Sequence, residues 1–325
     1  MSRTRTAKVI PRRASRIRLG ATALTVVCVF AGMSGLARAG ALQTQPGYRL
    51  LGGDGGVFSF GSARFLGSAA SDPRNCPTNP PERSLPNGSC VALAATPDGD
   101  GYWVLNRATG KIFPFGAAGA FGQPADQFAG VSPEFVPAFV GIVSTPTGHG
   151  YWVLALGASG AGTVMHYGDA GFFSDTQAIA SRNHTGFNGI PVALAATTDG
   201  NGYWEVHSDG GVFAFGDARF YGSMAGTHLN QPIVGIAPTQ DGKGYWLVGA
   251  DGGVFSFGDA HFGGSLAGRP LAVAVVGTAR NPLGPGYWLA ATDGTTYPLG
   301  GAPSLGSMHG TPLARPVFAI ASSAS

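Results

Sequence analysis

The sequence predicts an all-β protein, a six-bladed β-propeller with four-stranded blades, and three observations lead to this prediction. First, the 325 residues include 54 Gly and 23 Pro, which would interrupt long helices, while 44% hydrophobic and only 11% charged residues exclude a disordered chain. Second, a Gly-Tyr-Trp motif recurs along most of the chain. Third, the two ends carry complementary pieces of one repeat.

Residues 1–39 have the pattern of a secretory signal peptide. Eight of the 20 Lys and Arg residues precede position 40, an apolar stretch follows at 19–36, and Ala37-Arg38-Ala39 is a small-x-small cleavage signal. We expect cleavage after Ala39, a short linker over 40–46, and a protein that is secreted or associated with the cell wall. A retained anchor is the alternative, although an apolar stretch of 18 residues with three glycines is short for a bilayer span.

Removal of this leader changes the charge of the protein. The whole chain has a formal charge of +3, but the remainder holds 12 basic and 17 acidic residues, a balance of −5 without a basic cluster. A surface that follows a phosphate backbone needs such a cluster, so the composition argues against nucleic acid as a partner.

The Gly-Tyr-Trp motif defines the repeat. Its glycines stand at 47, 101, 150, 202, 244 and 286, in steps of 54, 49, 52, 42 and 42 residues, which is the spacing of propeller blades. The first copy is degraded to Gly47-Tyr48-Arg49, and the clearest is GYWLVGADGGVFSFGDAHFGGS at 244–265. The five tryptophans of the chain all lie in this motif: Trp103, Trp152, Trp204, Trp246 and Trp288.

Each unit is expected to contain four strands in order. The first is a small apolar run such as 234–238, the second contains Tyr-Trp, the third is Val-Phe-x-Phe, and the fourth is a short x-Phe-x-Gly segment. Alternation in the third strand places Phe255 and Phe257 on one face. Each Trp is large enough to fill the space between neighbouring sheets, so packing is its expected role.

Glycine and aspartate account for the reversals between these strands. Asp-Gly supplies the positive φ of tight hairpin turns, and Asp side chains bond the nearby backbone there. This structural role is expected for two groups of aspartates, namely Asp54, Asp209, Asp251 and Asp293 in the Asp-Gly turns, and Asp169, Asp217 and Asp259 in the Gly-Asp-Ala turns.

The ends of the chain predict how the ring closes. The first repeat begins at its second strand with Tyr48, and the chain finishes with an unpaired first strand at 316–321. If the last strand pairs with the first sheet, the ring has no exposed sheet edge at its ends. Residues 47–325 are therefore expected to form one closed domain.

These motifs resemble the Gly-Tyr-Trp and Asp-Gly-Gly-Val-Phe-x-Phe-Gly-Asp-Ala repeats of secreted proteins from high-GC actinobacteria, which occur alone or beside hydrolase modules. The resemblance spans residues 47–325; it is strong in the fourth and fifth copies and weaker in the second, third and last. It implies a propeller-like repeat and an exported bacterial setting, and the family has no agreed activity.

Two cysteines remain after the leader, Cys76 and Cys90, in a stretch rich in Pro and Asn. In an exported protein an even pair this close indicates a disulfide. A metal site would need further Cys or His residues nearby, and the stretch contains none.

Catalytic and metal-binding motifs are difficult to find. The expected first strands, which would line the central channel, contain no carboxylate, and the seven histidines show no ligand spacing. We therefore predict a non-enzymatic binding module without a cofactor. A calcium-dependent hydrolase of the lactonase or phosphotriesterase class is the alternative, with its ligands supplied by loops.

Three connections between units are long, at 67–90, 122–137 and 174–190, whereas 264–271 is short. Variable loops on a rigid scaffold often carry recognition, so we predict a binding rim there for a protein or a cell-wall glycan, on a monomer. Drift of solvent-exposed loops is the alternative. The predicted rim residues are Arg74, Arg83, Asp126, Phe128, Glu134, Phe135, Arg182, His184 and Phe187.

Overall fold

The computed structural model describes residues 45–77, 89–157, 160–183 and 186–324. The predicted signal peptide and the linker up to residue 44 lie outside these residues. Contacts divide the chain into two units, Met1–Leu42 and Gln43–Ser325. Within the described ranges, no helix has both the length and the apolarity that a membrane crossing requires.

The described residues form an all-β structure of six antiparallel sheets with three strands each, which agrees with the predicted fold class. The strands, sheet by sheet, are β1 (Pro46–Gly52), β2 (Val57–Gly61) and β18 (Val317–Ala324); β3 (Cys90–Ala95), β4 (Gly101–Asn106) and β5 (Ile112–Gly116); β6 (Ala138–Ser144), β7 (Gly150–Leu156) and β8 (Gly162–Gly168); β9 (Pro191–Ala196), β10 (Gly202–His207) and β11 (Val212–Gly216); β12 (Ile233–Pro238), β13 (Gly244–Gly249) and β14 (Val254–Gly258); β15 (Val275–Arg280), β16 (Tyr287–Ala291) and β17 (Thr296–Leu299). Short helices interrupt the loops: η1 (Ala69–Ser71), α1 (Pro124–Gln127), η2 (Pro133–Phe135) and α2 (Thr176–Asn183).

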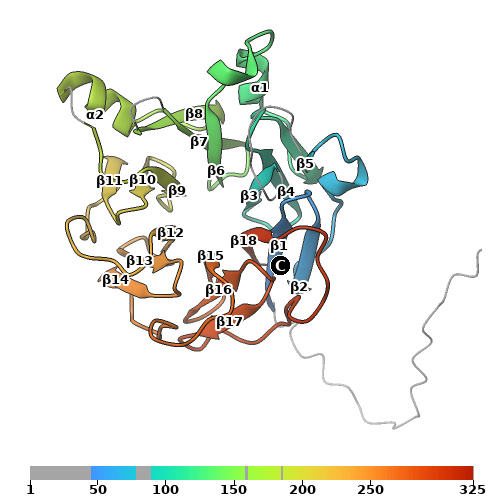
Figure 1. Cartoon of the computed structure of the whole chain (residues 1–325), viewed down its shortest axis with the longest axis vertical. Coiled ribbons are helices and arrows are strands. Elements are labelled where there is room, and N and C mark those ends of the chain that lie inside the picture. Colours follow the sequence, from blue (N-terminus) through green and yellow to red (C-terminus); the bar gives the residue numbers. More distant parts are fainter. Residues whose placement is uncertain (1–44, 78–88, 158–159, 184–185, 325) are drawn as a thin grey trace, which may run out of the picture. The chain divides into compact units, whose positions relative to one another are not determined.

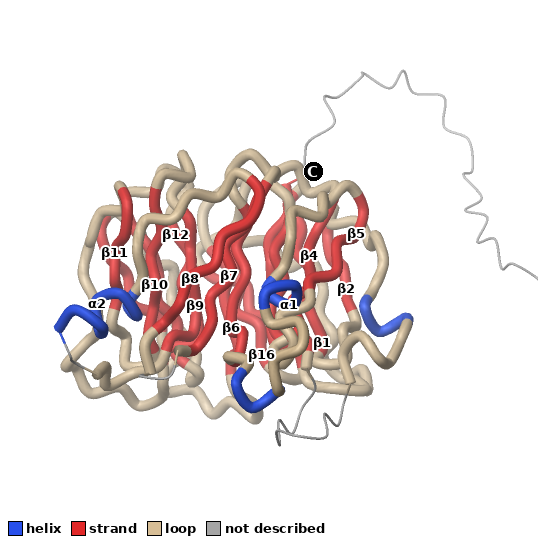
Figure 2. Tube along the Cα trace, turned by 90° about the horizontal axis from the view of Figure 1, so that it is seen from above, coloured by secondary structure: helices blue, strands red, loops and turns tan. Residues whose placement is uncertain are grey.

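The six sheets surround a common centre (Figure 1). The innermost strands contact one another in the order β18, β3, β6, β9, β12 and β15, and β15 contacts β18 again. Seen from the side, the strands run between two faces that carry the turns and loops (Figure 2). This arrangement is consistent with a six-bladed β-propeller.

The first sheet is completed by the last strand, as the chain ends predicted. Strand β18 pairs antiparallel with β1, in a register that runs from Pro46 opposite Ala324 to Gly52 opposite Val317. The observed strand begins one residue later than expected and extends three residues further.

The prediction of a fourth strand in each blade is wrong. Side chains hold the x-Phe-x-Gly segment, in place of a backbone ladder. In the fifth unit the indole of Trp246 donates to the carbonyl of His261 at 2.9 Å, and the Tyr287 hydroxyl of the next unit donates to Gly264 at 2.7 Å. These carbonyls accept from side chains, and the segment forms no strand.

Tryptophan and tyrosine pack together between neighbouring sheets, which confirms the predicted role of the motif. The ring of Trp204 lies 5.7 Å from that of Tyr245 in the following unit, and the same contact joins four other pairs of units. Four of the tryptophans are almost fully buried. Phe255 and Phe257 both pack against a core cluster that the fourth and fifth units form together, as their alternation predicted.

The first unit replaces the tryptophan with Arg49, which is fully buried. Its Nε donates to the carbonyl of Arg64 at 3.0 Å, the position that an indole N–H occupies in the other units. Its guanidinium carbon lies 4.8 Å from the centre of the Tyr102 ring, where a Trp would otherwise pack. Arg49 thus substitutes for both contacts of the missing tryptophan.

The Asp-Gly turns have the predicted geometry. Asp251 Oδ1 accepts from the backbone N–H of Gly253 at 2.9 Å, and Gly252 has φ of 74°, which an L residue rarely adopts. Asp54, Asp209 and Asp293 make the equivalent bond. In the Gly-Asp-Ala turns the expected partner is wrong, because Asp259 and Asp169 accept from the hydroxyls of Thr239 and Thr147 in a different turn.

Candidate functional site

Two faces of the domain are built from different connections. We call the first the turn face. There the turn between the first and second strands of a unit contacts the end of the third strand; for example, the Asp259 N–H donates to the carbonyl of Lys243. We call the second the loop face. There the turn after the second strand contacts the connection that arrives from the preceding unit; for example, the Ala250 N–H donates to the carbonyl of Pro232. The three long predicted loops end at the loop face.

Three predicted rim residues are exposed side chains of these loops. Arg74 follows η1 and forms an ion pair with Asp72 at 2.6 Å. The guanidinium of Arg74 holds the pKa of Asp72 at about 2 through a hydrogen bond. Phe135, at the end of η2, is 75% exposed, and Arg182 lies exposed in the last turn of α2.

Other predicted residues turn toward the scaffold. Phe128 packs on Phe139 of β6 with ring centres 6.1 Å apart, and Phe187 packs edge-on against His207 of β10 at 5.1 Å. Both phenylalanines are half-buried, so they attach their loops to the next sheet.

The two acidic rim residues are exposed. Asp126 accepts from the Gln123 amide at 3.0 Å, and Glu134 lies within η2. Arg83 and His184 lie outside the described residues. The rim set therefore divides into exposed side chains and loop anchors.

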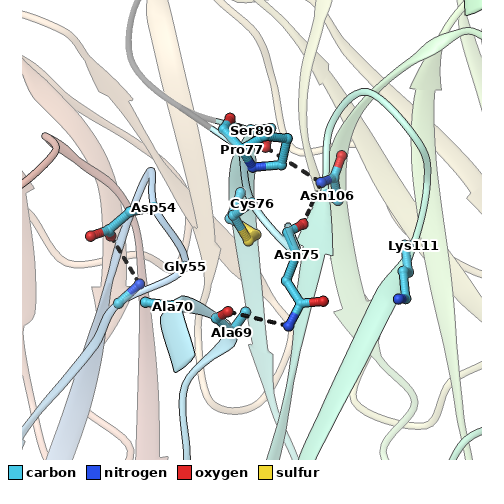
Figure 3. Close-up of a disulfide and its surroundings, with 12 residues drawn as sticks. Asp54, Gly55, Ala69, Ala70, Asn75, Cys76, Pro77, Ser89, Asn106 and Lys111 are labelled. Atoms are coloured by element: carbon cyan, nitrogen blue, oxygen red, sulfur yellow. Dashed lines mark hydrogen bonds between the residues drawn. A yellow bond between two sulfur atoms is a disulfide. The ribbon is translucent and has the colours of Figure 1, made fainter. Parts of the chain in front are cut away.

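The first long loop is held by a covalent bond and a buried amide (Figure 3). Cys76 and Cys90 form the predicted disulfide, with Cα atoms 5.4 Å apart. Asn106, at the end of β4, donates through Nδ2 to the carbonyl of Asn75 at 2.8 Å. Ser89 donates to the carbonyl of Pro77 at 3.1 Å. Residues on both sides of the disulfide are thereby fixed to the second sheet.

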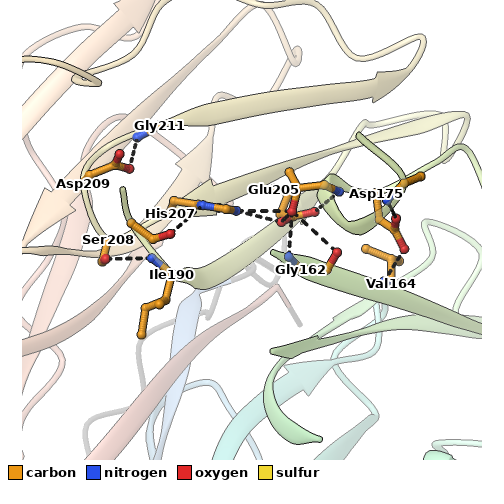
Figure 4. Close-up of polar contacts among 12 residues, drawn as sticks. Gly162, Val164, Asp175, Ile190, Glu205, His207, Ser208, Asp209 and Gly211 are labelled. Atoms are coloured by element: carbon orange, nitrogen blue, oxygen red, sulfur yellow. Dashed lines mark hydrogen bonds and ion pairs between the residues drawn. The ribbon is translucent and has the colours of Figure 1, made fainter. Parts of the chain in front are cut away.

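The third long loop is held by a buried polar network around Glu205 and His207 of β10 (Figure 4). Both side chains are at most 1% exposed, and Glu205 Oε1 lies 2.9 Å from His207 Nε2. Thr176, the first residue of α2, donates its hydroxyl to Glu205 Oε1 at 2.5 Å and its N–H to Oε2 at 3.2 Å. His207 Nδ1 lies 3.1 Å from the carbonyl of Gly189 near the end of the loop.

The hydrogen-bond partner of His207 Nδ1 determines whether this nitrogen carries a hydrogen. The carbonyl of Gly189 can only accept, so His207 Nδ1 carries a hydrogen. Sequence reasoning overlooked this pair, although the signal was present: the equivalent residues of the fifth unit are Leu247 and Gly249.

The mouth of the central channel lies on the turn face, where a cavity of about 590 Å³ is lined by the ends of the innermost strands. Small and hydroxylated residues such as Ala95, Ser144 and Thr197 form most of its wall, and Arg280 of β15 is the one charged residue among the described residues that line it. No group of three potential ligands from His, Cys, Asp and Glu occurs within the described ranges.

Four phenylalanines at one position of the repeat are half or more exposed. They follow the third strand of their units, on the segment that was predicted to be a fourth strand. These residues are Phe65, Phe172, Phe220 and Phe262, with exposed fractions of 61%, 50%, 60% and 55%. Sequence reasoning treated this position as part of a strand and did not single it out.

Comparison with known proteins gives no family. No protein-family model matches the chain, and no curated protein matches it.

Proposed function

We propose that this protein is a secreted, non-enzymatic six-bladed β-propeller of the actinobacterial Gly-Tyr-Trp repeat type, which binds a protein partner at or outside the cell envelope. The observation that carries the proposal is the attachment of the long loops to the loop face. A disulfide and Asn106 hold the first loop, and the buried Glu205–His207 pair holds the third. A loop that is ordered before binding loses less conformational entropy when a partner arrives.

The second long loop is attached by an amide side chain and an aromatic ring. The Gln123 side chain accepts from the backbone N–H of Ile112 at 3.0 Å, and Phe128 packs on Phe139. These anchors leave Phe135 exposed at the surface. An exposed aromatic ring beside charged residues is typical of binding surfaces, in which aromatic and Arg side chains contribute most of the affinity.

The experiment replaces exposed rim residues and retains the anchors. A variant with Arg74, Phe135 and Arg182 changed to Ala should fold normally and lose the partner captured from culture supernatant by the wild-type protein. The matched control changes three exposed phenylalanines at another position, Phe65, Phe220 and Phe262, to Ala. Equal capture by the wild type and the rim variant would contradict the proposed surface.

Glycan binding is a second candidate, favoured by the four exposed phenylalanines at equivalent positions. Aromatic faces pack against sugar rings, and repeated sites on one molecule raise avidity even when each contact is weak. Cosedimentation with purified cell-wall polysaccharide should then fall when the four residues are changed to Ala and persist in the rim variant. The hydrolase alternative would need carboxylates from loops, since small residues and Arg280 line the channel mouth.

A further inference from the structure

A crevice opens on the turn face between the fifth and sixth sheets, at a distance in sequence from the long loops. Its volume is about 190 Å³. One wall comes from the fifth unit and includes Trp246, Asp259 and Gly263, and the other comes from Arg280 and the 281–286 turn of the sixth unit.

At this junction the repeat has a glycine whose backbone lies close to the sixth unit, since a Cβ at Gly263 would approach the Gly300 Cα to 2.5 Å. Gly263 occupies a position at which the other five units carry large apolar residues. At the preceding junction that residue is Tyr221, whose hydroxyl donates to Gly242 at 3.1 Å and thus covers the turn that corresponds to 281–286. The five large residues, all packed against a hydrophobic cluster, are Leu66, Phe121, Phe173, Tyr221 and Leu305.

The tryptophans of the fifth and fourth units differ in exposure. Trp246 is 7% exposed, whereas Trp204 at the filled junction is 1% exposed. Glycines and Pro285 line much of the remaining wall, so the crevice offers backbone and ring surface to a small molecule.

Arg280 supplies the chemistry of the crevice. Its equivalents in other units are small, such as Ala95, Ala196 and Pro238, which occupy the same place opposite the motif tyrosine. The Nη1 atom of Arg280 is buried and has no hydrogen-bond partner among the described residues. Since a guanidinium remains charged, Arg280 gives this wall of the crevice a cation with which an anionic ligand can pair.

The second charge in the crevice restricts which anion fits. Asp259 also lines it, and Asp259 Oδ1 accepts from the Thr239 hydroxyl at 3.1 Å. One positive and one negative side chain balance each other, so a doubly charged phosphate would be repelled by the carboxylate. A singly charged carboxylate that also carries hydroxyl groups can satisfy Arg280 and donate to Asp259.

We propose that this crevice binds a small hydroxycarboxylate of the uronic acid class, with its carboxylate on Arg280 and a hydroxyl on Asp259. The ring of the ligand lies against Trp246 and the glycine-rich turn. The site is on the turn face and is independent of the rim on the loop face.

The test uses D-glucuronate as the probe, with D-glucose and inorganic phosphate as comparisons, in calorimetric titrations of the secreted protein. Glucuronate should bind at least tenfold more tightly than glucose, which lacks the carboxylate, and more tightly than phosphate. Labelling of the indole nitrogens places the ligand: the Trp246 cross-peak should shift with glucuronate, and the Trp204 cross-peak should remain.

Two substitutions with matched controls test the named contacts. Arg280→Met should weaken glucuronate binding by about tenfold or more, since it removes a charge-assisted hydrogen bond. Asp259→Asn should weaken it less, whereas Asp217→Asn, at the equivalent position of the junction filled by Tyr221, should leave it unchanged. Thermal unfolding of each variant verifies that it folds.

Three outcomes would overturn the proposal. The first is glucuronate affinity that is no greater than glucose affinity, and the second is unchanged glucuronate affinity in a folded Arg280→Met variant. The third is tighter binding of phosphate than of glucuronate, which would show that the crevice selects a different anion.

Discussion

Arg49 provides a sharp test of how the ring of sheets holds together, because it occupies the place of a tryptophan. Its side chain is fully buried and donates to two backbone carbonyls, Arg64 at 3.0 Å and Gly99 at 2.8 Å. Arg49→Ala leaves both carbonyls without these donors, at about 1 to 3 kcal/mol each, and adds a cavity. We expect a loss of about 3 to 6 kcal/mol in the free energy of unfolding.

Arg49→Trp tests whether Arg49 takes the place of the motif tryptophan, because it restores the residue that the other units carry. In the fourth unit the Trp204 indole reaches the Arg219 carbonyl at 2.8 Å, so a Trp at position 49 can make the same bond to Arg64 and pack on Tyr102. It removes the cost of burying a cation but loses the bond to Gly99. We expect Arg49→Trp to be more stable than Arg49→Ala by at least about 2 kcal/mol.

Urea unfolding followed by tryptophan fluorescence and circular dichroism measures both variants, with linear extrapolation to water. Arg64→Ala is the control, because that side chain is 68% exposed and its carbonyl is unaffected; it should change stability by less than about 0.5 kcal/mol. The reasoning is refuted if Arg49→Trp and Arg49→Ala unfold at the same urea concentration.

Three further predictions concern the disulfide, the buried pair and the tyrosines. Reduction of the Cys76–Cys90 bond should cost about 3 kcal/mol by loop entropy, and comparison of intact mass after alkylation with and without reductant checks the pairing. Glu205→Ala should destabilise the protein by about 2 to 4 kcal/mol and raise hydrogen exchange in α2, because it removes the carboxylate that accepts from the N–H and the hydroxyl of Thr176. Unchanged exchange would contradict the anchoring role. Burial raises the pKa of the interface tyrosines, so the unfolded chain loses their protons at lower pH than the folded protein. The free energy of unfolding should be unaffected below about pH 10 and fall as the pH rises above it, with tyrosinate absorbance appearing together with unfolding. Gradual ionisation of these tyrosines in a protein that stays folded would contradict this prediction. These residues are Tyr48, Tyr102, Tyr151, Tyr203, Tyr245 and Tyr287.

Most of the fold could be predicted because it repeats. The Gly-Tyr-Trp spacing indicated six units, the alternation in 254–257 placed Phe255 and Phe257 on one face, and the chain ends predicted the pairing of β18 with β1. The fourth strand was wrong because its sequence is compatible with an extended conformation. Only the hydrogen bonds of the Trp and Tyr side chains show that its carbonyls have other partners.

The candidate site was less predictable than the fold. Loop length indicated the long connections, yet it could not distinguish the exposed ring of Phe135 from the anchoring rings of Phe128 and Phe187. Whether a loop side chain faces solvent or packs on the next sheet depends on the residues of that sheet that it contacts, and these residues are distant in sequence.

The sequence by itself determined the number of units, the buried aromatic motif, the disulfide and the Asp-Gly turns, because each arises from local or periodic patterns. Tertiary structure decided that Arg49 replaces a tryptophan by bonding Arg64, that Glu205 holds the start of α2, and that a crevice lies beside Arg280. Each of these depends on a contact between different units of the repeat. The effect of a residue change in one unit can therefore be predicted only when the facing residues of the neighbouring unit are known.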